Sequence, residues 1–230
     1  RYSSTNPGSC DDSFGTRAPG SSGSTLGSGS SAVPYSQAVT GLLAGTTYYF
    51  CAIAQSAIGT GFGSVVSFTT PAQPGVTTSA ATAVTGTGAT LNGSANPNLA
   101  TATGWFRYSS TNPGTCSDSF GTRAPASGGT ALGAGSSAVP YSQAVTGLAA
   151  GTTYYYCAIA SNAVGTGLGN VMSFTTPGAP SVTTSAATSV TSSGATLEGS
   201  ANPNLGTTTG WFRYSTTNPG TCSDSFGTRA

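Results

Sequence analysis

The chain has 230 residues, a net charge of +1 and only 5% charged side chains, with neither lysine nor histidine. This composition excludes the basic surface that binds nucleic acids or anionic membranes, and no apolar run is long enough to span a bilayer as a helix. Gly, Ser, Thr and Ala dominate, but ten Tyr, nine Phe and two Trp can build a core.

A 106-residue repeat organises the chain. The string RYSSTNPG starts at Arg1 and Arg107, and RYSTTNPG starts at Arg213. This period has the size of a whole small β domain. Paired prolines in TTPAQPGVTTS and TTPGAPSVTTS mark the boundaries, because proline interrupts strand pairing and stiffens linkers. We therefore expect a window on a longer chain, with a partial domain over 1–71, a complete domain over 72–177 and a partial domain over 178–230.

The complete unit predicts strands and no helix. β-branched residues dominate, and turn signals recur about every 8 to 12 residues, as in a β-sandwich. Turns around Pro97 and Pro113 separate the early strands. The expected strands cover 76–84, 88–96, 103–110, 138–148, 152–165 and 169–176, with room for a short edge strand before residue 138.

The segment GLAAGTTYYYCAIASNAVGTG carries the most specific signal. Its Tyr154 fits a tyrosine corner, in which the Tyr hydroxyl satisfies backbone groups where a strand begins, and Tyr48 occupies the same place one repeat earlier. Side chains then alternate between two faces of the strand. One face carries Tyr154, Tyr156, Ala158 and Ala160, and the other carries Tyr155, Cys157 and Ile159.

This segment, followed by SFTTP, resembles the F–G half of a fibronectin type III domain. Residues 189–214 resemble the A–C half of the bacterial variant, which occurs in tandem in large secreted and surface proteins. The resemblance implies an all-β fold of tandem fibronectin type III-like, immunoglobulin-like β-sandwiches. Residues 1–71 would hold strands C to G, and residues 178–230 would hold strands A to C. The strand B Trp of many animal fibronectin domains and an Arg-Gly-Asp tripeptide are absent, so a cell-adhesion function does not carry over.

The five cysteines follow the repeat. Cys10 and Cys51 are 41 residues apart, and so are Cys116 and Cys157. In the implied topology Cys116 follows strand C and Cys157 lies in the neighbouring strand F, so we expect one disulfide per domain, Cys10–Cys51 and Cys116–Cys157. Intermolecular pairs and free thiols are the alternatives. Cys222 would find its partner beyond the chain end or in a neighbouring chain. Disulfides imply an extracellular or cell-surface location.

No residue set predicts catalysis, a cofactor or a metal site. The usual general bases and amine nucleophiles are missing, and Asp118 is the complete unit's one acidic residue. A calcium loop around Asp118 would need more oxygen ligands. The simpler interpretation is a turn in which Asp118 pairs with Arg123, Phe120 anchors the loop and Arg107 stays on the surface.

The outward face of strand F is a candidate packing face. Tyr155 and Ile159, and Tyr49 and Ile53 one repeat earlier, would lie beside one of two alternating sets of strand C positions. These sets are Trp105 with Arg107, and Phe106 with Tyr108, and the candidate face includes Trp105. Either the disulfide and a folded loop cover these side chains, or they pack between domains or between chains.

Near-identical repeats, very little charge and no catalytic residue types predict a structural protein whose partner is itself, in an extracellular fibre or cell-surface filament. The alternative is an adhesin, or a spacer or binding module of a large secreted protein. A third possibility is strand exchange, in which residues 178–212 of one chain complete residues 1–71 of a neighbour. We expect no enzymatic activity, no nucleic acid and no membrane span. A glycosylation sequon at Asn92 is lost in the next copy, where Glu198 replaces the Asn.

Overall fold

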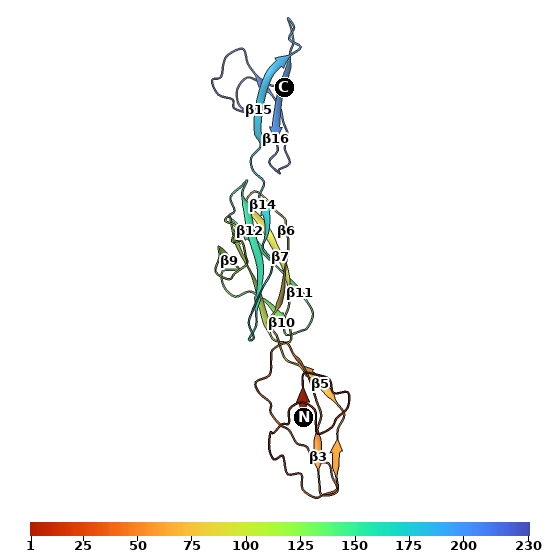
Figure 1. The fold of residues 1–230 in the computed structure, drawn as a ribbon. Coiled ribbons are helices and arrows are strands. Elements are labelled where there is room, and N and C mark those ends of the chain that lie inside the picture. The colour runs from red at the N-terminus through yellow and green to blue at the C-terminus, as the bar shows by residue number, and fades with distance from the viewer.

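The chain forms three bodies arranged end to end as a rod (Figure 1). The computed structural model describes residues 1–230, all of whose regular elements are strands, so the expected all-β fold is confirmed. Strands β1 to β5 form the N-terminal body, β6 to β14 the middle body and β15 to β18 the C-terminal body.

The middle body is a β-sandwich of antiparallel strands. One sheet has the order β11-β7-β6, and the other has β8 and β12 at its centre. The first sheet contains β6 (Gly75–Thr82), β7 (Gly88–Asn96) and β11 (Val139–Thr146). The second contains β8 (Ala102–Ser109), β9 (Thr122–Ala124), β10 (Thr130–Gly133), β12 (Thr153–Ser161), β13 (Thr166–Leu168) and β14 (Met172–Thr175).

The main core lies between these two sheets. Leu91 enters it from β7, and Phe106, Tyr156 and Ala158 enter it from β8 and β12. The opposite face of β12 carries Cys157 and Ile159, which are buried in a separate cluster. The predicted alternation of β12 between two faces is therefore confirmed, and both faces are covered.

The strand expected over 152–165 is wrong at its C-terminal end. β12 stops at Ser161, and β13 begins at Thr166. Asn162 causes the interruption, because its side-chain oxygen accepts hydrogen bonds from the amides of Val164 and Gly165 and so forms a tight turn. The chain then returns antiparallel to β12 as β13.

The two outer bodies contain small sheets of two or three strands and little core. The N-terminal body contains β1 (Tyr2–Ser3), β2 (Thr47–Phe50), β3 (Ile53–Gln55), β4 (Thr60–Phe62) and β5 (Val66–Thr69). The C-terminal body contains β15 (Ser181–Thr188), β16 (Thr196–Asn202), β17 (Arg213–Tyr214) and β18 (Thr228–Arg229). In the N-terminal body only Tyr48 and Cys51 are buried, and residues 178–230 contain no buried residue.

Candidate assembly surfaces

Two disulfides each tie a loop to a strand or its end: Cys116 lies in the β8–β9 loop and Cys157 in β12, while Cys10 follows β1 and Cys51 follows β2. Cys116 bonds Cys157, and Cys10 bonds Cys51, each with a Cα–Cα distance of 6.0 Å, which is ordinary disulfide geometry. These are the pairs that the 41-residue spacing predicts. Cys222 is an exposed free thiol. Both bonds therefore lie within single bodies and join no separate chains.

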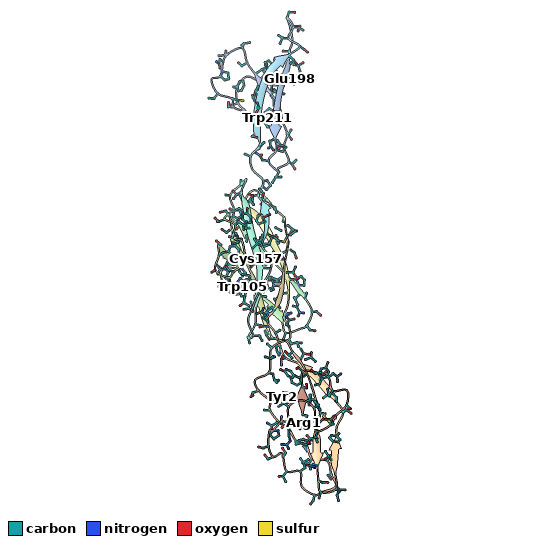
Figure 2. The ribbon with its side chains drawn as sticks, in the orientation of Figure 1. Arg1, Tyr2, Trp105, Cys157, Glu198 and Trp211 are labelled. Carbon is teal, nitrogen blue, oxygen red and sulfur yellow. A yellow bond between two sulfur atoms is a disulfide. The ribbon has the colours of Figure 1, made fainter.

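The loop between β8 and β9 covers the outer face of β12. Trp105 and Ile159 lie beneath this loop, packed against the disulfide and Phe120 (Figure 2 labels Trp105 and Cys157). The guanidinium of Arg123 lies over the indole ring, 4.7 Å from its centroid. Phe120 thus anchors the loop as the sequence predicts.

Asp118 holds the same loop through polar contacts. Its Oδ1 accepts a hydrogen bond of 2.8 Å from the indole nitrogen of Trp105 and one of 3.0 Å from Nε of Arg107. Arg107 also donates to the carbonyl of Gly121. The expected pairing of Asp118 with Arg123 is wrong, because Arg123 turns over the indole and donates to the carbonyl of Pro125, which follows β9. Arg107 of β8 therefore holds the loop against the sheet.

The same ion pair recurs in all three bodies. Nε of Arg1 lies 2.9 Å from Asp12, and Nε of Arg213 lies 2.9 Å from Asp224. Hydrogen bonds from Arg213 and then Trp211 hold the pKa of the Asp224 carboxyl below its ordinary value. In each repeat the Asp follows its Arg by eleven residues, and this constant spacing is the sequence signal for the ion pair.

The candidate packing face does not form an open surface in the middle body. Trp105 and Ile159 are buried under the disulfide-linked loop, so both are unavailable to a partner. Tyr49, Ile53 and Tyr155 are half-buried. The prediction that this face packs between domains or chains is therefore wrong for Trp105 and Ile159, and the alternative of a covering loop describes the middle body.

Two Tyr hydroxyls secure the starts of β12 and β2. The hydroxyl oxygen of Tyr154 accepts a 2.9 Å hydrogen bond from the backbone amide of Ala149, and that of Tyr48 accepts one of 3.0 Å from Leu43. Next to Tyr154, the hydroxyl of buried Thr176 accepts a hydrogen bond from the amide of Thr152 and donates one to the carbonyl of Ala149. Thr176 thus bonds the start of β12 to the segment of chain that leaves the middle body.

The junction between the N-terminal and middle bodies is hydrogen-bonded from both sides. Gly45 of the first body donates its amide to the carbonyl of Pro71, over 3.0 Å. The amide of Ala72 then donates to the carbonyl of Asn98, and the side chain of Asn98 donates over 2.7 Å to the carbonyl of Gln73. The linker is thus bonded to the preceding strand entry and to the loop between β7 and β8.

The junction between the middle and C-terminal bodies has the same construction. Gly151 donates to Pro177 over 3.2 Å, and Gly178 donates to the carbonyl of Asn204 over 2.9 Å. The side chain of Asn204 donates to the carbonyl of Ala179. Asn98 and Asn204 both adopt positive φ, 52° and 49°, a left-handed conformation that Asn tolerates better than most residues. Two successive joints therefore share one set of contacts.

The rod presents an open groove in its N-terminal body. The groove has a volume of about 1070 Å³, and its mixed lining includes the aromatic side chains of Tyr35, Phe50 and Phe68 beside polar ones such as Arg17 and Gln37. The C-terminal body presents exposed apolar side chains of its own, among them Val182 and Val190. Both outer bodies thus expose residues that the middle body covers.

The structure offers no group of three or more His, Cys, Asp or Glu side chains that could hold a metal ion. It also contains no helix with the length and apolarity needed to cross a membrane.

No protein family model matches the sequence, and no curated protein matches it either. Among solved structures, two forms of the sensor domain of the anti-sigma factor RsgI4 from Pseudobacteroides cellulosolvens are similar to part of the chain. The long form is 15% identical and has a TM-score of 0.31, and the match covers 51% of this chain and 99% of the sensor domain. The short form is 14% identical and has a TM-score of 0.32, and the match covers 46% of this chain and 96% of the sensor domain. Likeness at this level supports no assignment of family or function.

Proposed function

We propose that this chain is a structural repeat protein, in which tandem fibronectin type III-like sandwiches form an extracellular fibre or cell-surface filament. The proposed units are 1–71, 72–177 and 178–230, with the first and last being parts of the same domain type. The single observation that carries the proposal is the repetition of one set of hydrogen bonds at both junctions.

Repeated junctions support a filament for a geometric reason. When every unit is joined to the next by the same contacts, the same rotation and translation recur, and the array grows as a straight or helical rod. Paired prolines stiffen each linker, and the Asn side-chain bonds hold the linker against the body that follows it. A spacer between independent domains would need no such fixed orientation.

Composition supports the same role. Two disulfides favour an oxidising location outside the cytosol, and they stabilise small sandwiches that carry few aliphatic side chains. With six basic and five acidic residues in 230, little charge opposes contact between copies. The chain lacks His and Lys, and we propose no enzymatic role for it.

Electron microscopy of the purified protein tests this function. We expect straight filaments or rods whose axial repeat equals the length of one 106-residue unit. Single monomers whose bodies take variable orientations relative to one another would exclude a structural rod. Such particles would favour an adhesin or a spacer module.

A further inference from the structure

A single peptide unit connects the N-terminal body to the middle body. The carbonyl oxygen of Pro71 accepts a 3.0 Å hydrogen bond from the amide of Gly45, in the N-terminal body. The amide of the next residue, Ala72, donates over 3.0 Å to the carbonyl of Asn98, in the middle body. Both groups belong to one peptide, which resonance keeps planar. The two bodies are therefore bonded to the two polar groups of one rigid plane, with no free residue between them.

The N-terminal body fixes the chain up to this plane. The amide of Thr70 donates over 3.0 Å to the carbonyl of Thr46. The hydroxyl of Thr70 accepts from the amide of Thr46 over 3.0 Å and donates to the carbonyl of Leu43 over 2.6 Å. The residue that precedes Pro71 is thus held through its backbone and its side chain. What orients the plane against the middle body must therefore lie at residue 72 and beyond.

The side chain of Asn162 holds the other end of Ala72. Its Nδ2 donates over 2.7 Å to the carbonyl of Ala72 and over 2.9 Å to the carbonyl of Pro97. Pro97 is fully buried in the loop between β7 and β8, so its carbonyl is a fixed anchor. Ala72 is therefore bonded to the middle body through both its amide and its carbonyl.

The next two residues, Gln73 and Pro74, pack against the segment around β13. A Cβ added at Gly165 would lie 3.2 Å from Oε1 of Gln73. At Gly167 of β13 a Cβ would collide with the carbonyl oxygen of Pro74, and Pro74 itself is buried. The linker is therefore packed as part of the middle body and contains no separate hinge.

We propose that Asn162 is a positioning residue for this joint. By holding the carbonyl of Ala72, it fixes the Pro71–Ala72 peptide plane relative to the middle body, and the plane carries the N-terminal body. Without Asn162, Ala72 keeps only the bond from its amide to Asn98, and a single hydrogen bond tolerates a wide range of angles. This role rests on the proposed structural function, because a regular filament needs a fixed orientation at each joint.

The chain contains a matched side chain that builds the turn without the clamp. Ser56 occupies the place of Asn162 one repeat earlier. Its Oγ accepts from the amide of Ile58 over 3.2 Å, as Oδ1 of Asn162 accepts from the amide of Val164 over 2.9 Å. Ser is therefore compatible with this turn, but it lacks an amide group that could donate to two carbonyls at once.

Asn162→Ser separates the turn from the joint. The variant keeps a turn of the Ser56 type and loses the bonds to Ala72 and Pro97. In electron micrographs of the full chain, we expect a wider distribution of the angle between the N-terminal and middle bodies than in the wild type. By NMR hydrogen exchange, we expect the amide of Ala72 to exchange about fivefold faster, which corresponds to a loss of about 1 kcal/mol.

Asn162→Asp is the second test. Its carboxylate still accepts from the amides of Val164 and Gly165, as Oδ1 of Asn162 does, but it has no N–H for the carbonyl of Ala72. We expect the same two changes as in Asn162→Ser, so the result does not depend on one variant that folds poorly.

Asn92→Ser is the matched control. It makes the same change on β7, where Nδ2 of Asn92 donates within its own sheet, over 2.9 Å to the carbonyl of Ala80 and over 3.1 Å to Oγ1 of Thr82. We expect the middle body to lose a similar amount of stability in denaturant unfolding. The angle between the bodies and the exchange of Ala72 stay as in the wild type.

The role of Asn162 is overturned if both of its variants show the angle distribution and the Ala72 exchange of the control. It is also overturned if Asn92→Ser changes the two quantities to the same extent, since a general loss of stability would then explain the effect. In either case a narrow distribution in the wild type leaves the structural function standing. A wide distribution in the wild type would remove the structural function itself, and the role of Asn162 with it.

Discussion

The indole nitrogen of Trp105 donates a 2.8 Å hydrogen bond to Asp118 Oδ1, and this contact joins the buried outer face of β8 to the loop that covers it. Trp105 is buried beneath the loop, so its N–H needs a partner inside the protein. The same oxygen accepts from Arg107, whose guanidinium also binds the end of the loop. One carboxylate thus fixes the position of the loop relative to the sheet.

Replacing Asp118 with Ala lowers the stability of the middle body. The substitution leaves the Trp105 N–H without its acceptor, and we expect a loss of about 1 kcal/mol in the free energy of unfolding, since the Asp118 side chain is 45% exposed. Denaturant unfolding followed by fluorescence in a Trp211→Phe background measures the loss at Trp105. Asp118→Asn retains an acceptor for the indole N–H and loses less of this free energy. Asp224→Ala, which removes the equivalent carboxylate of the C-terminal body, is the control and leaves the unfolding midpoint of the middle body unchanged. An unchanged midpoint in Asp118→Ala would contradict the role of the contact.

The bond between Cys116 and Cys157 contributes more to stability. It closes a loop with a sequence separation of 41, for which the chain-entropy model gives about 4 kcal/mol. We expect the double variant Cys116→Ala/Cys157→Ala to lose a stabilisation of that order, measured by denaturant unfolding of the middle body. Cys222→Ala, which removes a free exposed thiol, leaves the midpoint unchanged. Equal midpoints for the two variants would contradict the prediction.

Asn98 ties the linker at the first junction to the middle body. In Asn98→Asp the carboxylate has no N–H to donate to the carbonyl of Gln73, while the positive φ is still tolerated. We expect a wider distribution of angles between the N-terminal and middle bodies in electron micrographs. Asn112→Asp makes the same charge change where the side-chain oxygen only accepts, from the amide of Gly114. A bend distribution equal to that of this control would exclude Asn98 as the fixing residue.

Tyr141 makes the middle body sensitive to alkaline pH. Burial raises the pKa of its phenol, and the hydroxyl donates to the carbonyl of Ile159 over 2.9 Å. The unfolded chain ionises this Tyr near pH 10 while the folded chain keeps it neutral, so its stabilisation is full below about pH 10 and falls as the pH rises further. Burial raises the pKa of Tyr156 as well, and it acts in the same direction.

The variant Tyr141→Phe tests the predicted loss of stability at alkaline pH. At neutral pH the variant is less stable than the wild type by about 1 kcal/mol, because the hydrogen bond to Ile159 is lost. Above pH 10 the difference in the free energy of unfolding between wild type and variant narrows, since the variant has no phenol to ionise at this site. Denaturant unfolding across the pH range measures this difference. A difference that widens as the pH rises would refute the predicted pH dependence.

The alternation of apolar and polar residues was sufficient to predict several strands of the middle body. The strand expected over 88–96 agrees with β7 at both ends, because inward Leu91 and Ala95 alternate with polar outward residues. The partner of Asp118 was not predictable in this way. Arg123 is closer than Arg107 to Asp118 in sequence, but the two Arg residues lie opposite each other on β8 and β9. The path of the loop alone decides that Asp118 pairs with Arg107.

By itself the sequence determined the 106-residue period and the two faces of β12, because each depends on spacing along one chain. The cysteine pairs were expected from the topology that the resemblance implies, with intermolecular pairs and free thiols as alternatives, and the structure shows both bonds within single bodies. The tertiary structure decided which faces are open. Trp105 and Ile159 are covered only because a loop with its own disulfide folds over them. The sequence VPYSQAVT is strand β11 at 139–146, where β7 pairs with it, and forms no strand at 33–40, since a strand needs hydrogen-bond partners from elsewhere in the chain.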